Sequence, residues 1–313
     1  MRGIDLARRT GWLGLAVALL LGCGPSDGTI GVLGSASPPA AKAPTFEEEF
    51  ATEDTLWETD APLPGAAVRV ADSVAAAGDG LAAALILPGH PEFSASDGTG
   101  PDVATALFSE QRFGFGTYRS RVAFGACGAK EEAAQAMLGY FNDGADHDGN
   151  SIIDDVEIDF QVLCGSPSFA YLTVFTDYEE SGGDVLFRKL THVVDFATGA
   201  TYDTPSASDD ELVAGAGEPA LRLPDLILPG RFYELGFEWH AGSVRFFIDA
   251  NDGGGERTLW TLDDPAHVPS AAVAVTYNLW HPDTHWLPAI DTAADFPAGD
   301  VVMQVDWFRY YAE

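Results

Sequence analysis

The stretch Asp155–Val162, which reads DVEIDFQV, alternates polar and apolar side chains without a break. This period of two is typical of a β-strand that is buried on one side, because successive side chains of a strand point to opposite faces. We expect a core to receive the apolar residues, Val156, Ile158, Phe160 and Val162. The opposite face is then expected to carry the polar residues, Asp155, Glu157, Asp159 and Gln161.

The row of acidic side chains on this strand has an electrostatic cost. Carboxylates two positions apart lie roughly 6.6 Å from each other at the backbone. Their repulsion raises the pKa of at least one of them unless solvent or a cation intervenes. The octapeptide alone is compatible with a functional row of carboxyl groups and with a solvated outer face of a strand.

Other segments support one comparison with known proteins, and they occur in a consistent order along the chain. They are Phe46–Phe50 with Leu56 and Trp57, Gln111–Val122, Tyr140–Gly144, Tyr233–His240 with Val244–Asp249, Asn278–Trp280, and Val305–Tyr310. With Asp155–Val162, these segments resemble glycoside hydrolase family 16, the family of the laminarinases and lichenases. The resemblance covers about residues 45–313. It implies an all-β fold, a concanavalin A-like β-sandwich (jelly roll) of two curved antiparallel sheets.

The resemblance also implies roles for the polar residues of the strand. The family pattern is Glu-x-Asp-x-Glu, or the same with one more residue before the last Glu. By position, Glu157 resembles the nucleophile, Asp159 its helper, and Gln161 stands at the place of the general acid/base. In the longer spacing that place falls on Val162, which cannot titrate either. The sequence therefore departs from the family at the acid/base itself.

This departure leaves two functional hypotheses open. A retaining glycosidase needs a carboxylate that attacks the sugar and a carboxylic acid that protonates the leaving oxygen. Loss of a general acid commonly costs about 10²–10⁴-fold in rate. The first hypothesis is a retaining endo-β-glucanase-like O-glycosyl hydrolase that acts on β-glucan-type polysaccharide and is weakened by Gln161. In this hypothesis Asp155, a side chain of an insertion at 201–230, or water supplies the proton for the leaving oxygen. The second is a non-catalytic glycan-binding surface lipoprotein.

Four residues are candidates for contact with the glycan. Trp280 and Trp286 offer flat aromatic faces to sugar rings, and Asn278 offers hydrogen bonds to hydroxyl groups. Either tryptophan could instead be a core residue. Arg121 corresponds to an arginine of the family's "FGYG" strand and is expected to give structural support or to line a subsite.

The loop before the strand spaces oxygen ligands as a calcium loop does. Its candidate ligands are Asp146, Asp148 and Asn150. The EF-hand frame fails because Ser151 stands where that frame requires Gly, and Glu157 would have to leave the catalytic site to be the twelfth ligand. A polar turn is the alternative. Apart from a possible structural calcium ion, we expect no cofactor.

The N-terminus has the features of an export signal. Arg2, Arg8 and Arg9 precede a short apolar run, and Leu20–Cys23 resembles a bacterial lipobox. We expect 1–22 to be a lipoprotein signal peptide, 23–44 a flexible tether rich in Gly, Ser, Pro and Ala, and 45–313 the family 16-like domain. Lipidation of Cys23 would make the protein an exported, membrane-anchored bacterial lipoprotein of the cell envelope. An ordinary cleaved signal is the alternative.

The chain is strongly acidic, with a formal net charge of −32. Removal of residues 1–22 would leave 13 basic and 47 acidic residues, a net charge of −34. This charge argues against nucleic acid and anionic surfaces as partners and is compatible with a neutral polysaccharide. We expect a monomer that touches the membrane only through its lipid.

Two cysteines remain after Cys23, and the exported chain meets an oxidising compartment. We predict a disulfide between Cys127 and Cys164, with two buried free thiols as the alternative. The composition of residues 129–136 predicts one or two helical turns before a strand near 136–141. Residues 201–230 are acidic and are expected to form a lid or a solvated loop.

Overall fold

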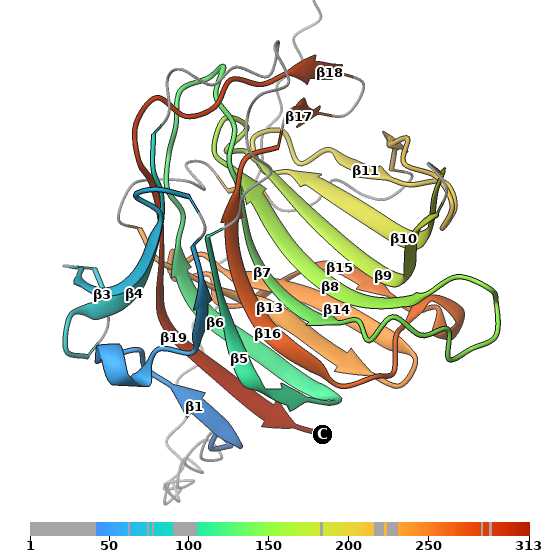
Figure 1. Ribbon diagram of the computed structural model, residues 1–313, viewed down its shortest axis with the longest axis horizontal. Coiled ribbons are helices and arrows are strands. Elements are labelled where there is room, and N and C mark those ends of the chain that lie inside the picture. The colour runs from blue at the N-terminus through green and yellow to red at the C-terminus, as the bar shows by residue number, and fades with distance from the viewer. Residues whose placement is uncertain are drawn as a thin grey trace, which may run out of the picture. The chain divides into compact units, whose positions relative to one another are not determined.

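Two antiparallel β-sheets form the protein in the computed structural model, and the nine-stranded one is visibly curved (Figure 1). The structure describes residues 42–61, 63–73, 75–76, 78–89, 105–181, 184–215, 222–223, 231–282, 284–287 and 290–313. The predicted all-β sandwich is confirmed. The predicted signal, Cys23 and most of the predicted tether lie outside the described residues.

One sheet has eight strands in the order β15-β14-β13-β6-β19-β4-β3, and β1 pairs with β19 beside that path. Its strands are β1 (Phe46–Glu48), β3 (Ala67–Asp72), β4 (Leu81–Leu87), β6 (Gly116–Ala123), β13 (Tyr233–His240), β14 (Ser243–Asp249), β15 (Arg257–Leu262) and β19 (Val301–Ala312). Strands that are far apart in sequence, such as β6 and β19, are therefore neighbours in this sheet, which is the non-sequential order of a jelly roll.

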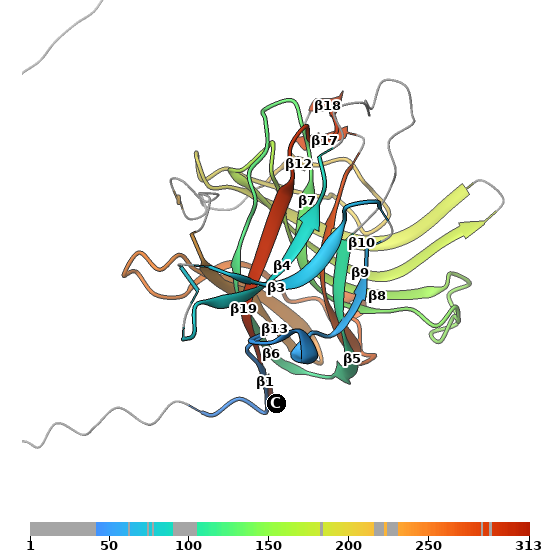
Figure 2. The same cartoon turned by 60° about the vertical axis from the view of Figure 1, so that its left-hand side comes forward.

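The other sheet has nine strands in the order β12-β11-β10-β9-β8-β7-β16-β5-β2. They are β2 (Glu58–Asp60), β5 (Thr105–Phe113), β7 (Ala134–Phe141), β8 (Asp154–Leu163), β9 (Phe169–Ser181), β10 (Asp184–Asp195), β11 (Thr201–Asp203), β12 (Val213–Ala214) and β16 (Val273–Trp280). Figure 2 shows the long hairpin of β9 and β10 extending outward. A separate hairpin joins β17 (Thr284–Leu287) to β18 (Ile290–Ala293), and short 3-10 helices cover Glu53–Thr55 and Pro265–His267.

The main core lies between the two large sheets and is rich in aromatic rings. Tyr118 of β6 stacks on Phe237 of β13 with ring centroids 4.6 Å apart. From β8 the core receives Val156, Ile158, Phe160 and Val162, all at most 4% exposed. The predicted core face of this strand is therefore confirmed, and its polar residues lie on the face turned away from the core, which we call the outer face.

The helix predicted over 129–136 is wrong. Residues 129–130 form a turn, and β7 already begins at Ala134. β7 pairs along its whole length with β8 on one side and β16 on the other. These ladders outweigh the weak helix propensity of an Ala- and Glu-rich segment.

The 201–230 region joins the fold at its edge. Within its described residues, β11 and β12 extend the nine-stranded sheet beyond β10. Residues 216–221 and 224–230 lie outside the described part of the chain. Among the described residues, no helix has the length and apolar character needed to cross a membrane.

Candidate functional site

Glu157, Asp159 and Gln161 follow each other along the outer face of β8. Strand pairing decides what lies beside each of them. Glu157 stands between Tyr140 of β7 and Phe175 of β9. Asp159 stands between Leu138 of β7 and Thr173 of β9. Gln161 stands between Ala136 of β7 and Tyr171 of β9.

The two aromatic neighbours of Glu157 were not predicted as site residues. Tyr140 is 40% exposed, an unusual exposure for a large ring on a sheet. Burial, and then the charges of Asp155 and Glu157, raise the pKa of the Tyr140 hydroxyl to about 12. Phe175 lies under the ammonium group of Lys189, 5.4 Å from the ring centroid. The outer face therefore presents an aromatic ring on each side of a carboxylate.

Glu157 and Asp159 form a coupled pair of carboxyl groups. Burial, and then the charge of Asp155, raise the pKa of Glu157 to about 7, although Asp159 and Lys189 act in the opposite direction. Burial and the neighbouring Glu157 hold the pKa of Asp159 well above its usual range. Two such carboxyl groups cannot both ionise easily, so they share a proton that resides mainly on Asp159.

Asp159 has an oxygen atom that needs this proton. The residue is 2% exposed, and its Oδ1 atom has no hydrogen-bond donor within the described part of the protein. Its Oδ2 atom accepts a hydrogen bond of 3.3 Å from the Nε2 amide of Gln161. A proton on Oδ1 that points to Glu157 would complete the arrangement. Gln161 thus orients Asp159, but its amide has no acidic proton to give to a leaving group.

Asp155 continues the acidic row on the other side of Glu157. It is 6% exposed, and its Oδ1 atom accepts a hydrogen bond of 2.9 Å from Asn142 Nδ2. Burial raises the pKa of Asp155, against the hydrogen bonds from Asn142 and Tyr140. These partners fix Asp155 to the wall of β7, away from Gln161.

Trp280 and Trp286, the two candidates for glycan contact, lie beside each other. Their ring centroids are 5.4 Å apart, and Trp286 also meets Tyr171 edge-on at 5.8 Å. The Tyr171 hydroxyl donates to the backbone oxygen of Trp286, which ties the β17–β18 hairpin to the sheet. Asn278 lies two strands from Gln161, with Ala136 between them. Its Oδ1 atom is buried and lacks a donor among the described residues.

The prediction for Arg121 is corrected. Arg121 belongs to β6 of the eight-stranded sheet, on the side away from the core, whereas Glu157 belongs to the other sheet. Its guanidinium group pairs with Asp306, donates to the backbone oxygen of Ala75 at 2.8 Å and lies over the Phe232 ring at 4.6 Å. Arg121 therefore supports the opposite sheet and does not line the site.

The predicted calcium ligands Asp146, Asp148 and Asn150 stay in one turn, and Asn150 Nδ2 donates a hydrogen bond of 3.1 Å to Asp148 Oδ2. Asp154 lies beside Asp146 and Asp148, with ligand atoms within 4.8 Å of one another. Asn150 also donates a hydrogen bond of 2.6 Å to the buried Asp177 of β9, and its Oδ1 atom accepts from the backbone of Ile152. Asn150 thus anchors the loop to the sheet.

A disulfide joins Cys127, which follows β6, to Cys164, which follows β8, with a Cα–Cα distance of 5.3 Å. Each cysteine lies just beyond a strand of a different sheet. The bond therefore connects the two sheets at the end of the strand that carries Glu157.

Comparison with known proteins is informative at the level of the fold. No protein-family model and no curated protein sequence matches this chain. A κ-carrageenase from Zobellia galactanivorans has a similar structure, with a TM-score of 0.50 and 13% identity over 85% of this chain and 93% of that one. A Bacillus licheniformis β-glucanase gives a TM-score of 0.46 and 15% identity, covering 87% of this chain and 100% of that one. A lichenase derived from a mouse hindgut metagenome gives a TM-score of 0.47 and 14% identity, covering 86% of this chain and 99% of that one. The likeness to the carrageenase shows that the two chains share the same jelly-roll fold.

Proposed function

We propose that the protein binds a neutral β-glucan-type polysaccharide on the outer face of the nine-stranded sheet and hydrolyses it slowly, with Glu157 as the nucleophile. The observation that carries this proposal is the position of Glu157, between the Tyr140 and Phe175 strands and beside the buried, donor-free oxygen of Asp159. The likeness of the fold to that of a κ-carrageenase supports a polysaccharide as the ligand, and the charge of the face, described below, favours a neutral one.

The chemistry of the outer face suits a sugar chain. Aromatic rings pack against the apolar C–H faces of sugars, and Tyr140, Trp280 and Trp286 offer such rings. The Oδ1 atom of Asn278 is an acceptor without a donor among the described residues. A sugar hydroxyl group would supply the missing donor, and an unpaired buried acceptor costs about 1–3 kcal/mol.

The charge of the face favours a neutral chain over a sulfated one. Asp155, Glu157 and Asp159 place three carboxyl groups in one row. The nearest cation on this face, Lys189, already pairs with Asp210. A sulfate ester would meet repulsion from the row and from a molecule of net charge −32.

The residues of β8 assign the steps of hydrolysis. Ionised Glu157 attacks the anomeric carbon and forms a glycosyl ester as the glycosidic C–O bond breaks, and the departing oxygen takes a proton from water. A second water molecule then hydrolyses the ester, which releases the sugar and ionised Glu157, and its proton neutralises the hydroxide left by the first step. Asp159 stabilises Glu157 through their shared proton. Gln161 cannot protonate the departing oxygen, so an alkoxide of a sugar is a poor leaving group here. The expected rate is about 10²–10⁴-fold below that of a site with an acid at this position.

The test is reducing-sugar release from laminarin and lichenan by the natural chain, by Gln161→Glu and by Glu157→Gln. We expect Gln161→Glu to raise the rate by about 10²–10⁴-fold. We expect Glu157→Gln to abolish release in either background. Release that survives Glu157→Gln would show that the nucleophile lies elsewhere and would overturn the assignment. Agarose and carrageenan serve as comparison substrates.

A second function, glycan binding without hydrolysis, is favoured by one observation. The Gln161 amide completes a hydrogen bond to Asp159 and so keeps the outer face ordered without a titratable group. An aryl β-glycoside with a weakly basic leaving group separates the two functions, because its departure needs no acid. A burst of aryl alcohol and a covalent adduct on Glu157 would support slow catalysis. No burst together with unchanged laminarin affinity in Glu157→Gln would establish the binding function instead.

A further inference from the structure

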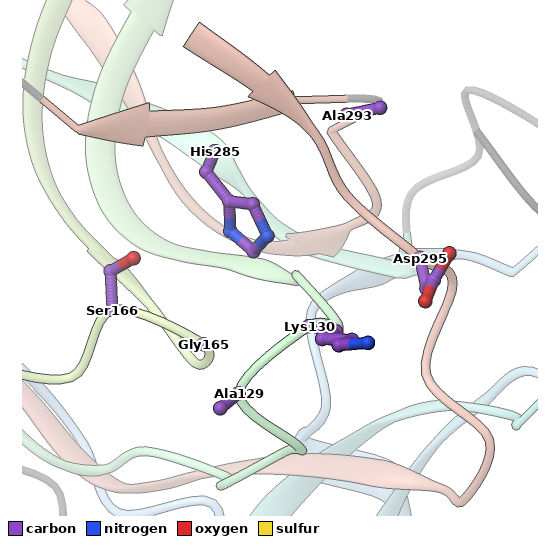
Figure 3. A pocket seen from close by; sticks show the side chains of 7 residues that line it. All are labelled: Ala129, Lys130, Gly165, Ser166, His285, Ala293 and Asp295. Atoms are coloured by element: carbon purple, nitrogen blue, oxygen red, sulfur yellow. The ribbon is translucent and has the colours of Figure 1, made fainter. Parts of the chain in front are cut away.

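A separate hollow of about 400 Å³ lies beyond the end of β8 (Figure 3). Its polar lining comes from segments that are far apart in sequence: Lys130, Gly165, Ser166, His285 and Asp295. Glu157 is six residues from Leu163, where β8 ends, which is roughly 20 Å along a strand. The hollow is therefore not part of the Glu157 site.

One wall of the hollow is organised by Glu132, which is wholly buried. Its Oε1 atom accepts a hydrogen bond of 2.6 Å from the backbone nitrogen of Gly165. Its Oε2 atom receives the Ser166 hydroxyl at 3.3 Å and lies 2.8 Å from His285 Nδ1. Because Nδ1 is engaged, Nε2 is the nitrogen of His285 that remains for a ligand. Figure 3 shows the ring directed into the hollow between Ser166 and Lys130.

The frame around the hollow is fixed by covalent and backbone bonds. The disulfide connects the segment before β7 with the turn after β8, through Cys127 and Cys164. The backbone nitrogen of Asp295 donates to the Lys130 oxygen at 2.8 Å, and that of Glu132 donates to the Asp295 oxygen at 3.0 Å. A frame of this kind needs little ordering when a ligand binds, which favours affinity.

The charges at the mouth of the hollow indicate the class of ligand. Lys130 and Asp295 are exposed, and neither side chain has an ion pair or hydrogen bond in the part of the chain that the structure describes. For an ionic ligand of either sign, the attraction to one of these two charges is offset by the repulsion from the other. Together with Ser166 and His285 Nε2, they match a neutral ligand that carries several hydroxyl groups.

We propose that this hollow binds one neutral sugar unit and is a second binding site for the polysaccharide of the outer face. The proposal rests on the function proposed above. The volume lies within the range of small-molecule sites, about 300–1,000 Å³. A chain that occupies both sites would be held at two points, and its second contact would raise its affinity without any new chemistry at Glu157.

The experiment follows the imidazole signals of His285 by NMR in the full chain labelled at histidine, with His285→Gln as the assignment control. D-Glucose, laminarihexaose and D-glucuronate are the probes. We expect D-glucose and laminarihexaose to shift the His285 signals and D-glucuronate to leave them unchanged. The double variant Lys130→Gln/Asp295→Asn should weaken this response at least tenfold. The double variant Arg257→Gln/Asp252→Asn removes the same two charges from an ion pair at the start of β15, in the other sheet, and should leave the response unchanged.

Two results would overturn the proposal. One is a His285 spectrum that neither neutral sugar moves, and the other is a response to D-glucuronate alone. Laminarihexaose that binds, by tryptophan fluorescence, without moving His285 would remove the second site and leave the proposed function intact. The opposite result is also informative: D-glucose shifts the His285 signals, but neither the natural chain nor Glu157→Gln binds or cuts laminarin. The hollow would then be a sugar site, and the function proposed for the outer face would be wrong.

Discussion

Glu157 combines two requirements that conflict in a partly buried carboxyl group. A nucleophile must be ionised, and burial beside Asp155 penalises the ionised form, which raises its pKa to about 7. Asp159 partly offsets this penalty by holding the shared proton. The environment of Glu157 is thus poised so that small changes in pH alter its charge.

The raised pKa of Glu157 predicts how the rate of glycosidic bond cleavage depends on pH. Below its pKa Glu157 is protonated and cannot attack, so the rate with an activated aryl β-glycoside should rise as pH increases through about 7. Such a substrate needs no acid, so no falling limb from residue 161 is expected. Initial rates across the range from about pH 5 to 9 would measure this. A profile that is flat around pH 7 would contradict the assignment of Glu157.

The same pKa predicts a gain of stability from removing the charge. A carboxyl group whose pKa is raised on folding contributes stability below its unfolded pKa, and this contribution is lost as pH rises through the folded value. At pH 8 the Glu157 charge is therefore destabilising, and Glu157→Gln should increase the free energy of unfolding by about 1–3 kcal/mol. Urea unfolding at pH 8 and pH 4 tests the sign, because the gain should disappear at the lower pH. Asp143→Asn is a matched control on an exposed carboxylate.

Strand β8 shows why part of the site was predictable. Polar residues such as Glu157 alternate with apolar ones such as Ile158 along this segment. Because side chains of a strand alternate between its two faces, this pattern predicts both the strand and the face on which each side chain lies. Tyr140 and Phe175 could not be placed in the same way. They reach Glu157 only through the registers of β7 and β9, which depend on pairings between distant segments.

Composition misled where tertiary pairing decides the structure. Residues 129–136 are rich in helix-forming residues, but the first of them form a turn and the last belong to β7, which is held extended between β8 and β16. Arg121 illustrates a different limit. Its motif identified the strand correctly, yet the motif carries no information about which sheet the strand joins. Sequence patterns therefore located the elements better than the contacts between them.

The disulfide acts at the level of elements, because it links the end of β8 to the segment after β6. Its cysteines are 37 residues apart, and closing a loop of this length stabilises the fold by about 4 kcal/mol in the chain-entropy model. We expect Cys127→Ser/Cys164→Ser to lose about this much free energy of unfolding, measured by urea denaturation. It should also weaken the His285 response to D-glucose, because the frame of the hollow is loosened. Equal stability of the two proteins would contradict this role.

Several of the few basic residues form ion pairs on the sheet opposite the site. Arg245 pairs with Glu238 and Glu256, and Arg309 pairs with Glu49. These ion pairs lie on the eight-stranded sheet, whereas the acidic row of β8 has little cationic compensation. The molecule therefore presents its most negative functional face to a ligand that must carry no negative charge of its own.

The N-terminal segment predicts where this face would operate. We propose that cleavage before Cys23 and lipidation of its thiol anchor the mature chain, with residues 24–44 as a spacer from the membrane. One acyl chain adds about 0.8 kcal/mol per buried CH₂ group, and several chains together make the attachment stable. In a bacterial host, palmitate label should be incorporated into the natural chain and into Cys127→Ser/Cys164→Ser, but not into Cys23→Ala. The Cys23→Ala protein should lose its membrane fraction while keeping its affinity for laminarin. Label that persists in Cys23→Ala would show that the export segment is processed in another way.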